Sequence, residues 1–254
     1  MKTAFTRALR LSWQRKKWIT TFIMLMACGL LVTLCHVVTA NPWLQVGFSL
    51  LPFFLAGMLL MPLGILLVRL YHDEVKKGES SLKKTLISSW ELMLSSTYLM
   101  LPPLLLFLFF WASLGLFTLL QELPGLHILL SFVPFILLFA CLILSASVLF
   151  VLFVAPAVLG LSNRKEVRKA LGIFSRFKKD PLGNMIFFLI ALIPAAITLV
   201  FLIITKALMF PIELSLAGQL LRNFIIMIPF VALMTLPTIF FFNIAAEAHA
   251  RLDA

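Results

Sequence analysis

One local cluster in the sequence holds residue types that act as acids, bases or metal ligands: His72, Asp73 and Glu74. An imidazole beside two carboxylates is a set that can bind a divalent metal or transfer a proton. Lys76 and Lys77 follow directly, in a charged connection between two apolar segments. This setting is typical of a solvated helix end, so we expect no catalytic or metal site there.

Neither the cysteines nor the known enzyme motifs give evidence of a catalytic or metal site. Cys28, Cys35 and Cys141 lie inside apolar segments and lack the Cys-x-x-Cys or Cys/His spacing of a zinc site. We interpret them as packed free thiols. The sequence has no HExxH metalloprotease motif, no GxSxG nucleophile elbow and no P-loop. It therefore predicts neither an enzyme nor a cofactor, and a nucleotide-driven role would require a separate ATPase.

Polar residues inside the apolar segments are few and mostly uncharged. We expect Ser145, Ser147 and Asn243 to make polar contacts between or within helices, with Asn243 the best candidate for a helix-to-helix contact. No Asp, Glu, Lys or Arg lies near the middle of an apolar segment. This counts against proton-coupled transport, which needs a buried carboxylate or histidine relay. Small polar groups beside prolines could still line a path for a polar substrate.

The composition indicates that lipid surrounds most of the chain. The hydrophobic fraction is 62% and the charged fraction 12%, against about 45–50% and about 25% in soluble domains. A helix needs about 20 apolar residues to cross a bilayer. We therefore predict an all-α polytopic helix bundle, a single transmembrane domain over residues 1–254. Its six transmembrane helices are predicted at 19–40, 44–69, 98–120, 128–160, 184–210 and 222–246.

Two features of these segments carry further expectations. The fourth has 33 residues, about 50 Å of helix against a hydrocarbon core of about 30 Å. We expect Pro134 and Pro156 near its ends to bend it or to mark where it leaves the lipid. The net charge of +11 is distributed very unevenly: the segments 1–18, 69–84 and 161–183 with Arg251 hold nineteen Lys and Arg, and the opposite side holds only Lys206 and Arg222.

This asymmetry predicts orientation and partners. Cytoplasmic connections of membrane proteins carry the excess of Lys and Arg. We therefore place the N- and C-termini and the basic connections in the cytoplasm, and the chain in a cell inner membrane. The positive charge is explained by topology, so no nucleic acid partner is expected. Membrane lipids with anionic headgroups are the expected partners.

A threefold internal repeat is predicted from two recurring markers. Residues 7–13 (RALRLSW), 84–90 (KTLISSW) and, more loosely, 169–175 (KALGIFS) are similar. A Pro-Phe pair after an aliphatic residue opens the second, fourth and sixth apolar segments. The order is the same each time, so we predict repeats at about 1–69, 78–160 and 161–254.

Each predicted unit is a surface helix followed by two spans. The surface helices are amphipathic, with apolar residues at helical spacing and a basic far face, which is typical of helices lying in the membrane interface on the cytoplasmic side. They could merely anchor the protein, or they could bind anionic headgroups or a cytoplasmic protein partner. The residues that we expect at the membrane surface are Arg7, Arg10, Trp13, Lys83, Lys84, Trp90, Arg164, Lys165, Arg168, Lys169, Phe174 and Phe177.

One stretch resembles a known pattern. Residues 153–159 (FVAPAVL), Lys169-Ala-Leu with Ser175, and 178–184 (KKDPLGN) follow one another in an order that is similar to poorly characterised bacterial six-span proteins. These include the membrane domain attached to some glycerophosphodiester phosphodiesterases. The resemblance covers about 50 residues, and Gly160 stands where that family commonly has an acidic residue. It implies a bacterial inner-membrane location and supplies no catalytic residues.

The sequence therefore favours a non-enzymatic integral membrane protein, an envelope scaffold or a lipid-associated accessory factor. The alternative is the membrane subunit of a transporter that docks an ATPase through its surface helices. An intramembrane lipid enzyme is the third possibility. A polar cavity between the spans would favour transport, and a tightly packed bundle would favour a scaffold.

Overall fold

A computed structural model describes residues 2–35, 42–77, 81–121, 131–161, 181–208 and 216–252, and these ranges are almost entirely helical, with no strand among them. Six helical stretches in these ranges are long and apolar enough to cross a membrane, which confirms the predicted all-α chain with six candidate spans. The elements are α1 (Lys2–Ser12), α2 (Arg15–Cys35), α3 (Pro42–Lys77), α4 (Leu82–Thr97), η1 (Tyr98–Met100), α5 (Leu101–Leu120), α7 (Val133–Leu161), α9 (Pro181–Leu208) and α10 (Leu216–Leu252).

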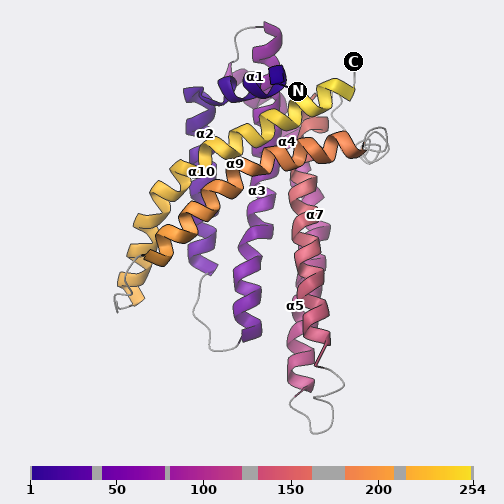
Figure 1. Ribbon diagram of the computed structural model, residues 1–254, viewed down its shortest axis with the longest axis vertical. Coiled ribbons are helices and arrows are strands. Elements are labelled where there is room, and N and C mark those ends of the chain that lie inside the picture. Colours follow the sequence, from indigo (N-terminus) through magenta and orange to yellow (C-terminus); the bar gives the residue numbers. More distant parts are fainter. Residues whose placement is uncertain are drawn as a thin grey trace.

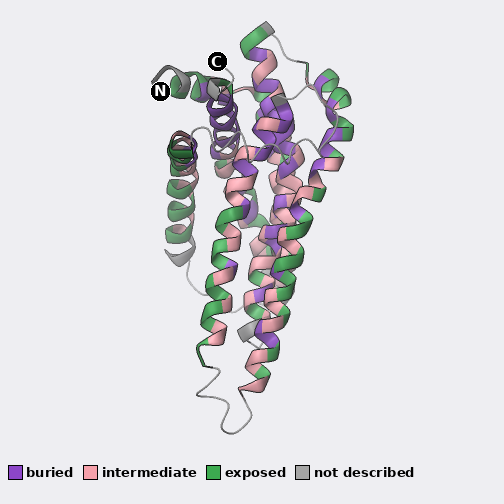
Figure 2. Ribbon diagram, turned by 90° about the vertical axis from the view of Figure 1, so that its right-hand side faces the viewer, coloured by how far each residue is buried: buried purple, intermediate pink, exposed green. Residues whose placement is uncertain are grey.

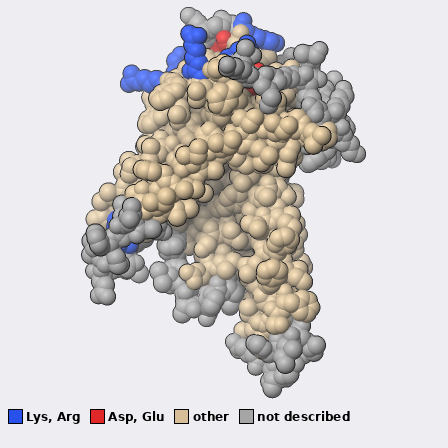
Figure 3. Space-filling view, in the orientation of Figure 1, with Lys and Arg blue, Asp and Glu red and all other residues tan. Residues whose placement is uncertain are grey.

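The helices form one column and one oblique hairpin. Helices α3, α5 and α7 run side by side along the long axis, while α9 and α10 cross them at an angle (Figure 1). Helix α1 lies across the end at which both termini are found, and it packs on α10. We call this end of the molecule the basic end, because the Lys and Arg side chains gather there (Figure 3).

The core is concentrated at the basic end. Buried residues gather in that half of the molecule, and the far half is mostly half-buried or exposed (Figure 2). Residues 239–249 of α10 are all buried, and α10 as a whole packs against α1, α2, α3, α7 and α9. Phe188 of α9 packs edge-on against Phe153 of α7 and Phe241 of α10. The tight part of the bundle therefore coincides with the part that carries the charge.

Two spans are longer than predicted. The spans expected at 44–69 and 222–246 belong to helices that continue to Lys77 and Leu252. The sequence prediction ended the two spans at Arg69 and just before Glu247. Both residues lie within their helices, and their side chains find partners inside the protein, as described below. At about 1.5 Å per residue, the 36 residues of α3 extend about 54 Å, well beyond a hydrocarbon core of about 30 Å.

Prolines define two other boundaries. The fourth span, predicted from residue 128, is helical from Val133, with Pro134 in its first turn and Pro156 inside the helix. The predicted surface helix and third span form one stretch, in which α4 passes through η1 into α5. Pro102 and Pro103 open α5, where they lack the N–H groups that would continue an α-helical ladder from α4. The third predicted surface helix, at 164–179, lies outside the described residues.

Glycines allow helices to approach closely at the basic end. A Cβ on Gly64 of α3 would meet the ring of Phe242 on α10 and stand 2.8 Å from Cβ of Pro156 on α7. Both neighbours are buried rings that cannot move aside easily. Gly57, two turns earlier, has ordinary space: an added Cβ would lie 3.6 Å from Met100 and from Val148. Of these two glycines, Gly64 is the one that fixes a three-helix contact of α3, α7 and α10.

We therefore expect Gly64→Ala to destabilise the protein by about 1–3 kcal/mol, the usual cost of overpacking a core. The matched control Gly57→Ala should be neutral or stabilising by up to about 1 kcal/mol, because Ala has the higher helix propensity. Thermal unfolding in detergent measures both. An equal response of the two variants would contradict the close approach at Gly64.

Candidate functional site

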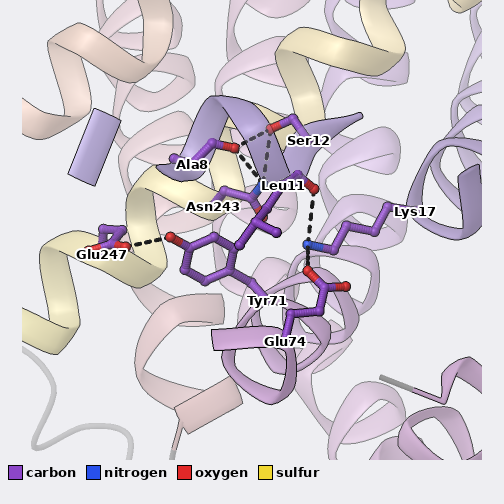
Figure 4. A network of polar contacts seen from close by, with 8 residues as sticks. All are labelled: Ala8, Leu11, Ser12, Lys17, Tyr71, Glu74, Asn243 and Glu247. Atoms are coloured by element: carbon purple, nitrogen blue, oxygen red, sulfur yellow. Dashed lines mark hydrogen bonds and ion pairs between the residues drawn. The ribbon is translucent and has the colours of Figure 1, made fainter. Parts of the chain in front are cut away.

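Side chains from four helices form a polar network inside the basic end (Figure 4). Helices α1, α2, α3 and α10 each contribute to it. We define the polar network by its members, which are Ala8, Leu11, Ser12, Lys17, Tyr71, Glu74, Asn243 and Glu247.

A buried ion pair joins α2 to α3. Lys17 Nζ lies 2.6 Å from Glu74 Oε2, and the two side chains are 0% and 3% exposed. The ammonium also donates to the carbonyl oxygen of Leu11, in the last turn of α1, at 3.4 Å, and it lies 5.2 Å from the centre of the Tyr71 ring. A buried ammonium is tolerated only where such partners replace its water. Lys17 therefore ties three helices together.

The ion pair corrects one prediction from the sequence. The group His72, Asp73 and Glu74 was expected to be a solvated helix end, which is wrong for Glu74 because its carboxylate is buried against Lys17. The two partners lie 57 residues apart, so local context could not reveal the pair. The available signal was that a predicted helical hairpin brings the start of α2 beside the end of α3.

A second set of contacts joins α3, α10 and α1. The Tyr71 hydroxyl donates to Glu247 Oε1 at 2.5 Å, and the Arg7 guanidinium lies 3.5 Å from the same oxygen. Glu247 is almost enclosed, with 11% of its side chain exposed, while 52% of the Arg7 side chain is exposed. Glu247 thus receives one buried partner and one partner at the surface.

Asn243 binds α1 to α10. Its Nδ2 donates to the carbonyl oxygen of Ala8 at 3.2 Å and to Ser12 Oγ at 2.9 Å, and Ser12 Oγ donates in turn to the Ala8 carbonyl at 2.7 Å. This residue, predicted to be a helix-to-helix contact, therefore joins α10 to α1, the first predicted surface helix, rather than to another candidate span. Asn243 Oδ1 and Thr21 Oγ1 are the buried side-chain atoms without a hydrogen-bond partner in the described part of the chain.

Arg69 forms a separate junction between α3, α4 and α7. Its Nε donates to the carbonyl oxygen of Gly160, near the end of α7, at 3.1 Å. A terminal nitrogen donates to Ser89 Oγ at 2.6 Å and to the carbonyl of Ser88 at 3.3 Å. A cation at the carbonyl end of a helix also interacts favourably with the helix dipole. Arg69 therefore fixes α4 against the column.

The other predicted site residues have different positions. Ser145 and Ser147 donate to the carbonyls of Cys141 and Ile143 in their own helix α7, so of the two expected kinds of contact they make the one within a helix and not the one between helices. The predicted surface residues with described side chains are exposed: Arg7, Arg10, Trp13, Lys83, Lys84 and Trp90. The predicted surface residues Arg164, Lys165, Arg168, Lys169, Phe174 and Phe177 lie outside the described residues.

The charged groups in and beside the polar network are paired across helices. Lys17 and Arg7 each stand beside a carboxylate, so the buried part of the network carries paired charge. Among the described residues no group of three or more His, Cys, Asp and Glu side chains could hold a metal ion. The three cysteines are free thiols, with Cys28 and Cys141 buried. Arg7 lies at the edge of the polar network, where it contacts the network member Glu247 and has a half-exposed side chain.

Comparison of the chain with protein-family models, curated proteins and solved structures finds no match.

The ion pair gives a test by a double-mutant cycle. Lys17→Met should destabilise the protein by about 3–5 kcal/mol, because it leaves the Glu74 carboxylate buried without a cation. Lys17→Met with Glu74→Leu should recover most of this loss, since both charges are then removed. Unfolding of the purified protein in detergent measures each variant.

The neighbouring carboxylate provides the control. Asp73 is half-buried and accepts from Thr85 at 3.4 Å, so Asp73→Asn should cost less than about 1 kcal/mol. A double variant whose loss equals the sum of the losses of Lys17→Met and Glu74→Leu alone would show that the two side chains act independently.

Proposed function

We propose that this chain is a non-enzymatic protein of a bacterial inner membrane, a lipid-associated accessory factor or envelope scaffold that binds anionic lipids at its basic end. The observation that carries the proposal is the outward face of α4. This face combines large apolar side chains with two lysines, a pairing that suits the boundary between headgroups and acyl chains.

Helix α4 packs on the protein through a face that mixes small polar residues with apolar ones. Thr85, Ser89, Leu92, Met93 and Ser96 are buried, whereas Ile87, Trp90 and Leu94 are exposed, Trp90 at 55%. Exposing this apolar stripe to water would forgo about 25 cal/mol for each Å² that lipid could cover. Lys83 and Lys84 are exposed in the first turn. A helix of this kind is stable with its apolar stripe in the acyl layer and its cations near phosphate groups.

Helix α1 has the same arrangement. Ala8 and Ser12 are buried against α10, while Trp13 is 71% exposed. In the predicted repeat, Ser12 and Trp13 correspond to Ser89 and Trp90 of α4. Ser12 accepts from Asn243 of α10, as Ser89 accepts from Arg69 of α3. The shared docking contact supports the correspondence of the first two units of the proposed threefold repeat and the proposed interfacial position of both helices.

The distribution of charge supports the proposed orientation. On the face shown in Figure 3, blue side chains gather at the basic end, and the remaining described surface is almost entirely tan apart from a small blue patch at the far end of the α9–α10 hairpin. We propose that the basic end, with both termini, faces the cytoplasm. The resemblance to the bacterial six-span family remains a proposal that agrees with this location.

The alternative of a transporter subunit assigns the same surface to an ATPase. The outward faces of α1 and α4 favour lipid, because their large apolar residues lie next to exposed cations, and α4 leads through η1 into α5, which also exposes large apolar residues. Capture of an ATPase by crosslinkers placed on α4 would decide for the alternative.

Lipid retention tests the proposed function. We expect the purified protein to retain anionic over zwitterionic lipid after extraction from a mixed bilayer of known composition. Lys83→Glu with Lys84→Glu should reduce this preference roughly tenfold or more, because each basic residue near an anionic surface contributes about 1 kcal/mol. Arg222→Glu, on the other side of the predicted membrane, is the control and should leave it unchanged. Loss of preference in the control alone would contradict the proposal.

The orientation has its own measurement. A fluorescent-protein fusion at the C-terminus should fluoresce, and an alkaline phosphatase fusion after Gln121 should be active, because the first reporter needs the cytoplasm and the second the opposite side. The reverse pattern would overturn the proposed topology.

A further inference from the structure

We propose that Arg7 is shared between two anionic partners, Glu247 of α10 and the phosphate of an anionic membrane lipid, so that Glu247 sets the affinity of α1 for that lipid. This inference rests on the membrane-surface contact proposed above. It makes Glu247, a member of the polar network, a residue that regulates lipid binding.

The geometry allows Arg7 to exchange Glu247 for another anionic partner. Its guanidinium stands 3.5 Å from Glu247 Oε1, longer than the usual charge-assisted hydrogen bond of about 2.7–2.9 Å. Half of the Arg7 side chain is already exposed. A guanidinium has five N–H donors in a fixed plane and binds phosphate through two of them at once. A lipid phosphate therefore offers Arg7 a better-matched partner than the single carboxylate oxygen does.

Glu247 keeps a partner when Arg7 leaves. The Tyr71 hydroxyl donates to the same oxygen at 2.5 Å, so the carboxylate retains a buried hydrogen bond. The Lys17–Glu74 pair is unlike this one, because both of its side chains are enclosed and no outside anion reaches the ammonium. Of these two ion pairs, the one between Arg7 and Glu247 is the one in which the cation can exchange its carboxylate for an outside anion.

Helix α1 also keeps its position during the exchange. Asn243 holds the Ala8 carbonyl and the Ser12 hydroxyl, and the rings of Phe5 and Phe240 pack edge-to-face with their centres 5.3 Å apart. The outward residues Leu9 and Trp13 are exposed beside Arg10. With these side chains in the interface, the Arg7 guanidinium lies at headgroup depth, where phosphate is present.

A double-mutant cycle on lipid binding tests the inference. The four proteins are wild type, Arg7→Gln, Glu247→Gln and the double variant, each titrated in detergent with phosphatidylglycerol and with phosphatidylcholine and followed by native mass spectrometry. Glu247→Gln should tighten phosphatidylglycerol binding by about two- to fivefold, the range set by a partly exposed ion pair. Arg7→Gln should weaken it. The double variant should bind like Arg7→Gln, because the competitor matters only when Arg7 is present.

Controls separate competition from net charge. Glu91→Gln removes one negative charge from the exposed face of α4 and should not reproduce the tightening. Arg10→Gln removes a cation from α1, and in that background Glu247→Gln should still tighten binding. Arg7→Lys replaces Arg7→Gln if the latter does not purify folded; it keeps the charge but loses the two-point contact, so Glu247→Gln should tighten it less than it tightens wild type.

Each opposing outcome has a distinct meaning. Tightening by Glu247→Gln that persists without Arg7 would overturn the inference in favour of bulk charge. Displacement of the lipid by inorganic phosphate would assign the contact to a soluble anion and overturn the choice of lipid. Equal binding of both lipids by wild type would contradict the proposed function itself, whereas a lipid preference that ignores Glu247 would contradict only this inference.

Discussion

The basic end of the molecule depends on the burial of one ammonium group. Lys17 has no exposed surface, and its charge is balanced by Glu74 and by the carbonyl end of α1. A cation removed from water requires partners at fixed positions, so α1, α2 and α3 must meet at one point. Helix α10 then packs over this point with eleven consecutive buried residues, 239–249. The concentration of the core at one end, with looser packing beyond it (Figure 2), follows from this arrangement.

Much of the fold could be predicted because lipid imposes long apolar segments. The six spans and the helix contact of Asn243 were visible in the sequence, since an amide inside an apolar run needs a partner. Glu74, Tyr71 and Glu247 were not visible as a group, because their partners are 57, 176 and 240 residues away along the chain. Charges at span ends usually reach water, and only tertiary packing decides that these do not.

The predicted surface helices show that an amphipathic pattern alone does not predict which face of a helix contacts the protein. A helical wheel of α4 separates apolar from charged residues, but the face that contacts the protein combines the small polar Thr85, Ser89 and Ser96 with the apolar Leu92 and Met93. The small residues allow the backbones of α3 and α4 to approach, while the apolar side chains of Ile87, Trp90 and Leu94 remain outside. In water the same helix would be expected to turn its apolar stripe inward. The direction of Trp90 therefore carries information about the solvent in which the helix is stable.

The docking of α1 on α10 has a consequence for biosynthesis. A ribosome makes α1 before α10, so the partner of Ser12 emerges 231 residues after it. Until then Arg7 lacks Glu247, and Asn243 has yet to be made. In the position that we propose for it at the membrane surface, α1 therefore waits for α10 while the candidate spans between them are made, and its outward Trp13 and neighbouring cations suit it to that position. Synthesis of α10 is the step that completes this docking contact.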